Sequence, residues 1–287
     1  MPDPNLLNTT SDGLIALPAG PWSAEKLYYL EGYINIFETS MKDKWRKRNY
    51  IDLFAGPGKI RIRNTSEYLL GSPLIALTIR FPFTGYYFVD NDQKHTDALK
   101  LRCSASPNRD LVHVYTDDAN RVVTSIVSSI QRLTPSSLNL AFLDPFGLEL
   151  DWNTVSKLGS LKCDLIIYYS QAGISRNIEK AYLSTKETIV DRFFGTDEWR
   201  NVYTPWHIKP NKPGKHRELI NFYKERLRTL GYQEVKQFEE ASSEPLIRNS
   251  YLMTPLYRLI FASKHPLGED FAKKITRIDR YGQKQMF

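Results

Sequence analysis

The chain has 287 residues, of which 41% are hydrophobic and 25% are charged, and its formal net charge of +7 corresponds to a pI near 9.2. These values are typical of a globular protein with one large domain or two small ones, and a charge of this size favours a polyanionic partner only weakly. Two distant cysteines and five scattered histidines exclude a disulfide scaffold and indicate no metal site.

The apolar content and the N-terminal sequence predict where in the cell the protein lies. The first residues, MPDPNLLNTTSDG, have neither the basic start nor the apolar core of a signal peptide. No stretch approaches the roughly 20 apolar residues that a membrane span needs. We therefore expect a cytoplasmic protein that does not enter the membrane.

The N-terminal part is predicted to be an arm followed by a helix. Residues 1–20 are polar and rich in Pro, Gly and Thr, which is typical of a loose arm. From Ser23, a suitable N-cap, to about residue 47, apolar residues recur every three or four positions, which predicts a helix with a basic end. We treat residues 1–49 as an N-terminal arm and helical extension.

Residues 50–170 alternate short apolar strands with helices. A basic, irregular segment, residues 59–70, precedes a helix that Ser72-Pro73 opens. Strands that recur with a helix between each pair predict right-handed βαβ units and a parallel sheet. We therefore expect a Rossmann-like core, whose ligands bind at the carboxyl ends of the strands. The strands are predicted at residues 50–54, 86–89, 111–115, 138–143 and 164–169.

The alternation is interrupted at residues 171–213, which predicts an insertion with a helix near residues 178–194. Residues 214–287 then complete the same domain with two further strands, at 233–238 and 256–263, and a basic tail. The complete prediction is an α/β domain with a mostly parallel seven-stranded sheet and helices on both faces. Its last strand is predicted to run antiparallel to the others.

The strongest motif is the turn after the first strand, Asp52-Leu53-Phe54-Ala55-Gly56-Pro57-Gly58. Glycines at this place let the backbone approach a ligand closely and turn the chain towards the next helix. The full G-x-G-x-x-G pattern and the Lys-Ser/Thr pair of a P-loop are both absent, which argues against a dinucleotide and a triphosphate. The acid before the turn would repel phosphates and suits an ammonium or sulfonium group. The candidate cofactor residues here are Asp52, Phe54, Ala55, Gly56 and Gly58, and the alternative is a plain strand-to-helix turn.

Two further acids follow the next strands. Asp90 stands where Rossmann-type sites place an acid on ribose hydroxyls, although it could also cap the following helix. Asp118, with Ala119, could hydrogen-bond an adenine amino group, or it could be the N-cap of the next helix. Together with the turn, these residues predict S-adenosylmethionine (SAM) as the cofactor and no metal.

Asp144-Pro145-Phe146-Gly147, after the fourth strand, is the candidate catalytic loop. An exocyclic amino group is a poor nucleophile because its lone pair conjugates with the ring. If Asp144 and the carbonyl of Pro145 accept its two hydrogens, the nitrogen becomes tetrahedral and can attack a methyl group, while Phe146 stacks on the flipped base. The alternative is a structural Asp-Pro turn.

Taken together, these segments resemble the three-Cys-motif partner proteins (TcmP family), over roughly residues 12–280. The resemblance implies a class I methyltransferase fold and a protein partner, a radical-SAM-like protein that carries three cysteines. The Asp-Pro-Phe-Gly loop also resembles the motif of tRNA guanine-N2 dimethyltransferases. In the related amino-methyltransferase motif a second proline stands at the position of Phe146, so Tyr168 or Tyr169 could supply the aromatic face instead. The segments that carry the TcmP resemblance are Trp22-Ser23 with Lys26, Tyr50–Gly58, Ser72-Pro73-Leu74, Asp118-Ala119-Asn120, Phe142–Gly147, Phe193-Phe194-Gly195 and Leu256–Pro266.

The leading functional hypothesis is SAM-dependent N-methylation of a base, with a nucleic acid or a nucleotide as the substrate. Basic segments at residues 42–48, 59–63 and 209–217 are candidates for contacts with phosphates. Two alternatives stay open. One is a non-catalytic SAM-binding subunit that serves the radical-SAM-like partner, and the other is a Mg²⁺-dependent nucleic-acid-processing enzyme that uses acids of the same sheet edge.

Overall fold

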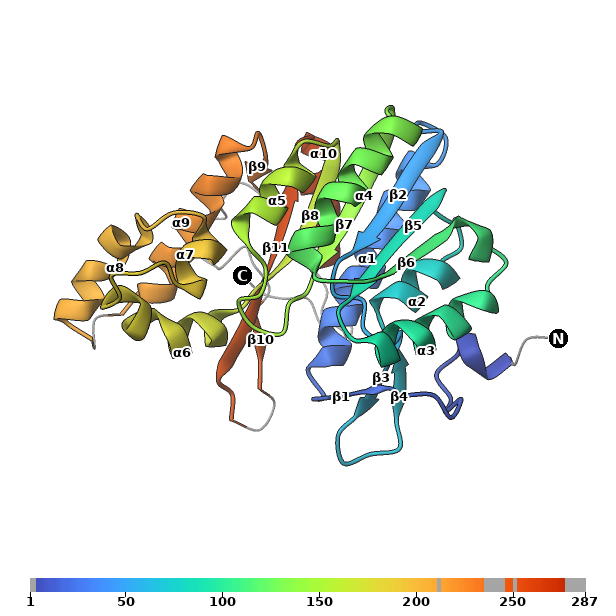
Figure 1. Cartoon of the computed structure of the whole chain (residues 1–287), viewed down its shortest axis with the longest axis horizontal. Helices are drawn as coiled ribbons and strands as arrows, with labels where there is room; N and C mark the ends of the chain where they lie inside the picture. Colours follow the sequence, from blue (N-terminus) through green and yellow to red (C-terminus); the bar gives the residue numbers. More distant parts are fainter. Residues whose placement is uncertain (1–3, 211–212, 235–245, 250–251, 277–287) are drawn as a thin grey trace.

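The computed structural model describes residues 4–210, 213–234, 246–249 and 252–276. In these residues five apolar strands form the parallel centre of one large sheet, in the order β8-β7-β2-β5-β6 (Figure 1). Every residue of β8 is buried, as expected for a parallel strand that is covered on both faces. The predicted parallel core is confirmed. Its strands are β2 (Lys47–Asp52), β5 (Gly85–Asp90), β6 (Val112–Thr116), β7 (Ser137–Leu143) and β8 (Cys163–Tyr169).

The edge of the sheet beyond β8 is antiparallel. β11 (Pro255–Ser263) runs antiparallel to β8, so the predicted direction of the last strand is confirmed. Two short strands, β9 (Gln233–Glu234) and β10 (Leu246–Arg248), both pair with β11. Residues 235–238 of the predicted strand lie outside the described residues, and β10 adds an eighth strand that the sequence did not indicate. The mixed α/β architecture is consistent with a Rossmann-like fold.

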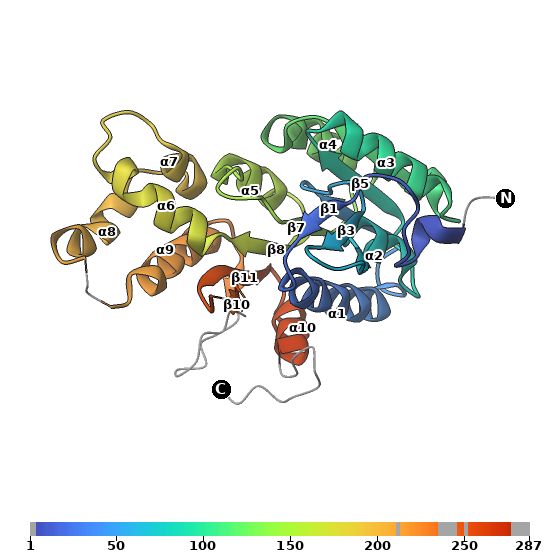
Figure 2. The ribbon, with the colours of Figure 1, turned by 90° about the horizontal axis from the view of Figure 1, so that it is seen from below.

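Helices cover both faces of the sheet, because alternate residues of each strand point to opposite faces. Tyr50 packs in the buried cluster of one face and Ile51 in that of the other. The first face is covered by α1 (Ser23–Met41), α2 (Ser72–Thr78), α3 (Gln93–Ser104) and α10 (Pro266–Thr276). The second is covered by α4 (Ala119–Leu133), α5 (Trp152–Gly159), α6 (Gln171–Tyr182), α7 (Ile189–Phe194), α8 (Trp199–Ile208) and α9 (Lys215–Thr229). Figure 2 shows α1 and α10 on one side of the sheet and α4 and α5 on the other.

The segment after β8 holds more helices than the sequence indicated. The predicted helix near residues 178–194 is divided into α6 and α7, because Thr188 and Asp191 form a capping box that begins a new helix. α8 and α9 follow, and these helices extend beyond β11 at one end of the sheet (Figure 1). None of the helices in the described residues is both long enough and apolar enough to cross a membrane.

The N-terminal segment is not the loose arm that its polar composition indicated. A short 3₁₀ helix (Pro4–Leu7) begins it, and a second one (Arg109–Leu111) precedes β6. β1 (Leu17–Ala19) pairs with β3 (Lys59–Ile62), which pairs with β4 (Tyr68–Leu70). These strands form a small second sheet where the sequence indicated an irregular segment at residues 59–70.

A buried charge cluster holds this segment in place; it consists of Asp12, Lys59 and Arg102. The Asp12 carboxylate lies 3.0 Å from Lys59 Nζ and 2.8 Å from Arg102 Nη2, and all three side chains are at most 1% exposed. Burial alone would raise the pKa of Asp12, but hydrogen bonds from Arg102 and Lys59 lower it to about 2. Because the folded pKa lies below the unfolded value of about 3.9, the stabilisation is complete above about pH 4 and is lost as the pH falls towards 2.

The basic run at residues 42–48 lies in the turn after α1 and at the start of β2, rather than at the end of a helix. α1 ends at Met41 and β2 begins at Lys47. Arg48 is buried and donates from Nε to Glu38 Oε2 at 2.8 Å, and from Nη1 to the backbone oxygen of Trp45 at 2.6 Å. Arg48 and Lys59 therefore have partners within the protein, and neither can contact a phosphate as the sequence suggested.

Replacing Asp12 with Ala should destabilise the protein strongly, because Lys59 and Arg102 then lose their carboxylate. Removing one partner of a buried ion pair costs about 3–5 kcal/mol. Urea unfolding at neutral pH measures the loss. The control is Asp43→Ala, whose carboxylate is 81% exposed beside Lys42 and which should change stability by less than about 0.5 kcal/mol. Equal losses in the two variants would contradict a structural role for Asp12.

Candidate functional site

A cavity of about 530 Å³ lies at the carboxyl ends of the parallel strands. This is the edge at which sheets of this kind bind their ligands. The small sheet and the β10–β11 pair project from the same edge (Figure 1). Of the candidate site residues, all but Asp52 line the cavity, namely Phe54, Ala55, Gly56, Gly58, Asp90, Asp118, Ala119, Asp144, Pro145 and Phe146.

The glycine turn forms one wall of the cavity with its backbone. Gly56 and Gly58 have φ angles of 60° and 92°, a conformation that L side chains rarely adopt. Three hydrogen bonds fix the turn: Ala55 N–H to Val89 O at 2.8 Å, Gly56 N–H to Asp90 Oδ2 at 3.0 Å, and Gly71 N–H to the carbonyl of Gly58 at 2.7 Å. A ligand can therefore approach the backbone of this wall closely.

The space behind Gly58 also requires glycine. A Cβ atom there would lie 2.9 Å from Leu99 Cδ1 and 3.2 Å from Leu74 Cγ. On the other side of the turn, Arg102 Nη1 donates to the carbonyl of Pro57 at 2.6 Å. The buried charge cluster thus supports the turn directly.

Asp52 lies behind the turn and is fully buried, so its side chain does not line the cavity. Its Oδ1 accepts from Phe54 N–H at 3.2 Å, whereas its Oδ2 has no hydrogen-bond partner in the described structure. Burial raises the pKa of Asp52, with a contribution from the charge of Asp144, while the hydrogen bond from Phe54 N–H and the charge of Lys26 oppose the rise; the resulting pKa is about 7. A buried carboxylate oxygen without a partner costs free energy, which a cationic group bound nearby would recover.

Asp90 and Asp118 already have hydrogen bonds within the protein. Asp90 holds the glycine turn through Gly56, and its Oδ1 accepts from Asp92 N–H at 2.9 Å and lies 3.0 Å from His95 Nδ1. Asp118 is the N-cap of α4, which was the alternative to the adenine contact. Both capping bonds reach Oδ1, and Oδ2 accepts no hydrogen bond from the described residues. In the described part of the chain, no group of three or more His, Cys, Asp or Glu side chains could hold a metal ion.

Asp144 forms an ion pair with a residue that the sequence did not single out as part of the site. Lys26 Nζ, from α1, donates to Asp144 Oδ2 and lies 5.0 Å from the ring centroid of Tyr168. Within the described residues, Asp144 Oδ1 accepts no hydrogen bond. The only sequence signal for Lys26 was its place among the segments that carry the TcmP resemblance.

Two tyrosines complete the wall beside Asp144. The rings of Tyr168 and Tyr257 meet edge to face with centroids 5.5 Å apart, and both line the cavity. Tyr168 is fully buried and its hydroxyl has no partner in the described structure. Tyr169 points to the opposite face of the sheet, where it packs against Phe193. Of the two tyrosines that the sequence offered, only Tyr168 therefore lines the cavity.

The loop after β7 is held in place by Asn120, which was not among the residues predicted for the site. Asn120 Nδ2 donates to the backbone oxygen of Glu149 at 2.7 Å, and its Oδ1 accepts from Asp151 N–H at 3.0 Å. Phe146, at the rim of the cavity, is 79% exposed. An apolar ring this exposed gains free energy when a ligand covers it.

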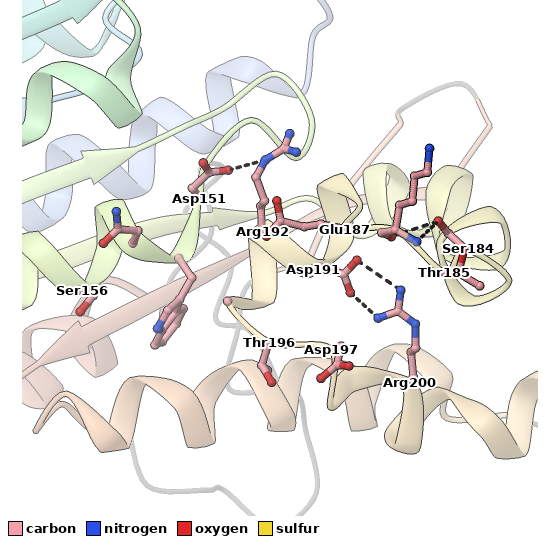
Figure 3. Close-up of a pocket in the computed structure, with 14 residues that line it drawn as sticks. Asp151, Ser156, Ser184, Thr185, Glu187, Asp191, Arg192, Thr196, Asp197 and Arg200 are labelled. Carbon is pink, nitrogen blue, oxygen red and sulfur yellow. Dashed lines mark hydrogen bonds and ion pairs between the residues drawn. The ribbon is translucent and has the colours of Figure 1, made fainter.

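A second hollow, of about 770 Å³, lies between α5, α7 and the start of α8. Figure 3 shows that its charged side chains point towards one another, Asp151 to Arg192 and Asp191 to Arg200. Paired charges of this kind are typical of a junction that holds helices together. The candidate residues from the sequence all lie away from it.

Comparisons with known proteins do not identify the chain. No family model and no curated protein matches it. Among solved structures, a Legionella pneumophila protein of a family of unknown function is 10% identical, with a TM-score of 0.44, over 87% of this chain and 91% of that one. The human methyltransferase 10 domain containing protein is 16% identical, with a TM-score of 0.34, over 58% and 72% of the two chains. A Bordetella parapertussis protein described as a possible exported protein is 11% identical, with a TM-score of 0.38, over 91% and 77%.

These likenesses are too weak to carry an argument about activity. With no family model matched, the resemblance to the TcmP family stays a prediction.

Asp52→Asn should stabilise the protein at alkaline pH. The folded pKa of about 7 lies above the unfolded value of about 3.9, so ionisation of Asp52 destabilises the fold progressively between pH 4 and 7. The stability difference between the variant and the wild type should therefore grow by about 2 kcal/mol from pH 5 to pH 8. Urea unfolding at both pH values measures it, with the exposed Asp43→Asn as the control. A difference that does not change with pH would be inconsistent with a strained, ionisable Asp52.

Proposed function

We propose that this chain is a SAM-dependent methyltransferase that methylates an exocyclic amino group of a base in DNA or RNA. The observation that carries the proposal is the single cavity that combines the glycine turn, the acids at the strand ends and the Asp144-Pro145-Phe146 loop. The antiparallel last strand at the edge of the sheet supports it, because class I methyltransferases share this feature.

The residues at the glycine-turn end of the cavity fit the cofactor; we call this the cofactor end. The backbone of Ala55, Gly56 and Gly58 leaves room for close approach, and the charge of a cationic amino-acid group in the cavity would favour the ionised form of Asp52 behind the turn. Asp90 would accept from ribose hydroxyls. Oδ2 of Asp118, which accepts no bond in the described chain, would accept from the adenine amino group, beside Phe54 and Ala119. SAM, when bound, supplies an electrophilic methyl group on a sulfonium sulfur.

The residues at the other end fit a planar base; we call this the acceptor end. Asp144 Oδ1 and the carbonyl of Pro145 would accept the two hydrogens of the target amine, which frees the nitrogen lone pair for attack. Lys26 holds the carboxylate through Oδ2 and so leaves Oδ1 for this contact. The exposed ring of Phe146 offers aromatic surface for stacking, and the buried ring of Tyr168 lies in the cavity wall beneath Lys26. Because the chain's groups are already in place, catalysis would rest mainly on positioning.

The cofactor end can be tested by binding alone. Isothermal titration with S-adenosylhomocysteine in the presence of a chelator should show binding. Asp118→Asn should weaken it by about tenfold, because Asn keeps the helix cap but places an amino group where adenine needs an acceptor. The control is Asp92→Asn, which makes the same change at the N-cap of α3 and outside the cavity. The absence of any binding heat or thermal shift for the wild type at millimolar ligand would overturn the proposal.

The acceptor end can be tested by turnover. Asp144→Asn should lower the rate of methyl transfer about 10²–10³-fold, since its carboxylate acts where charge develops on the attacking nitrogen. Affinity for S-adenosylhomocysteine should change less than about threefold. Tritiated SAM with cellular DNA, RNA and nucleotide pools provides the assay, and Asp117→Asn, an acid of the same cavity paired with Arg121, is the matched control. A stable Asp144→Asn variant that methylates at the wild-type rate would rule out this role.

A further inference from the structure

Trp22 is the N-cap residue of α1 and lines the cavity. Before it in the chain, Leu17 of β1 contacts the cofactor end, because a Cβ atom on Gly56 would lie 3.0 Å from Leu17 Cδ1. One helical turn after it, Lys26 N–H donates to the carbonyl of Trp22 at 3.4 Å, and the Lys26 side chain holds Asp144 at the acceptor end. The segment from Leu17 to Lys26 thus runs from the cofactor end to the acceptor end, and Trp22 lies in the cavity between them.

The backbone of Gly20 lies against one face of the Trp22 ring. A Cβ atom on Gly20 would lie under 3.0 Å from Cζ2, Cη2 and Cζ3 of Trp22, at nearly equal distances. These three atoms are consecutive in the six-membered ring, so a point equally far from all of them stands over the face of the ring. The φ angle of Gly20 is not positive, so it is the ring, and not the backbone conformation, that leaves no room for a side chain here. The indole itself is half-buried, which leaves part of its surface accessible.

The other aromatic side chains of the cavity have different positions. The rings of Tyr168 and Tyr257 pack against each other, and Lys26 Nζ already lies over the ring of Tyr168. Phe146 is exposed at the rim, and Phe54 packs against the buried cluster on the second face of the sheet. The indole packs against the cluster of the first face. In the described part of the chain, no cation lies over it as Lys26 lies over Tyr168.

A sulfonium group needs a partner of this kind. It carries a positive charge but no hydrogen-bond donor, so it is best stabilised by negative charge or by the face of an aromatic ring. At the acceptor end Lys26 already neutralises Asp144, and its own charge would repel a second cation. The carboxylate of Asp52 lies behind the turn rather than in the cavity wall. An indole offers a cation the most favourable of the aromatic faces.

We propose that the indole of Trp22 contacts the sulfonium group of SAM and so stabilises the charged cofactor more than the product, S-adenosylhomocysteine, whose sulfur is neutral. The proposal rests on the function proposed above, because that function places SAM in this cavity. With Gly20 behind it, the ring has little freedom to lose when the cofactor binds. Transfer of the methyl group to the amine leaves the sulfur neutral, which weakens the contact and favours release of the product.

Isothermal titration with SAM and, separately, with S-adenosylhomocysteine tests the proposal without turnover. Trp22→Leu keeps apolar volume but removes the aromatic face, so it should lower the affinity for SAM about tenfold and that for S-adenosylhomocysteine less than about threefold. Trp22→Phe should give an intermediate loss, because its ring attracts a cation less strongly. The control is Trp45→Leu, which removes a half-buried indole beneath Lys162 and outside the cavity. It should change both affinities less than about twofold.

A second variant tests the position of the ring while the ring is still present. The methyl group of Gly20→Ala would stand over the indole and displace it, so the affinity for SAM should fall about fivefold. In the Trp22→Leu background the same substitution should have no further effect, because the ring that it displaces is gone. An effect of equal size in both backgrounds would mean that residue 20 acts independently of the indole, which would contradict the proposal.

The outcomes separate this proposal from the proposed function. Selective loss of affinity for SAM in the Trp22 variants supports it. Equal losses for SAM and S-adenosylhomocysteine, or unchanged affinity for both, would overturn it and leave the methyltransferase proposal standing. A wild type that binds neither molecule would overturn both proposals.

Discussion

The conformation of the glycine turn, residues 55–58, is the constraint on which the site depends. Its positive φ angles exclude most side chains, and its bare backbone forms the wall that a ligand can approach. The turn is held from each side: by Asp90 and Val89 at the end of β5, by Gly71 at the start of α2, and by Arg102 of α3. Because α3 and β5 fix the turn, substitutions well outside the cavity would change its shape.

The acids at the two ends of the cavity have different surroundings. At the cofactor end, Asp52 is buried with one unpartnered oxygen, so the free protein holds an acid whose ionisation is costly. At the acceptor end, Asp144 is paired with Lys26, and the positive charge lies over the ring of Tyr168. The buried, unpartnered oxygen of Asp52 at the cofactor end favours a cation nearby. The ion pair with Lys26 at the acceptor end holds the carboxylate of Asp144 in place for hydrogen bonding. This division is the one expected for the cationic cofactor and the neutral acceptor that we propose.

Much of the fold could be predicted because its parallel strands are continuous apolar runs and because βαβ connections allow few topologies. The same topology brings residues that follow different strands, such as Gly56, Asp90 and Asp144, to one edge. The ion pair of Lys26 could not be predicted, since it joins residues 118 positions apart. Nor could the burial of Lys59, because a basic residue in a polar segment gives no sign of the acid that will neutralise it.

The buried charge cluster also has a consequence for how the chain reaches its native state. Asp12 and Arg102 are 90 residues apart in the sequence, yet each needs the other before it can be buried. The entropy of closing so long a loop must be overcome before their contact stabilises anything. During synthesis, Asp12 leaves the ribosome long before α3 exists to receive it. The segment that holds Asp12 therefore cannot be buried in its native place before α3 has been made, and the glycine turn lacks the support of Arg102 until then.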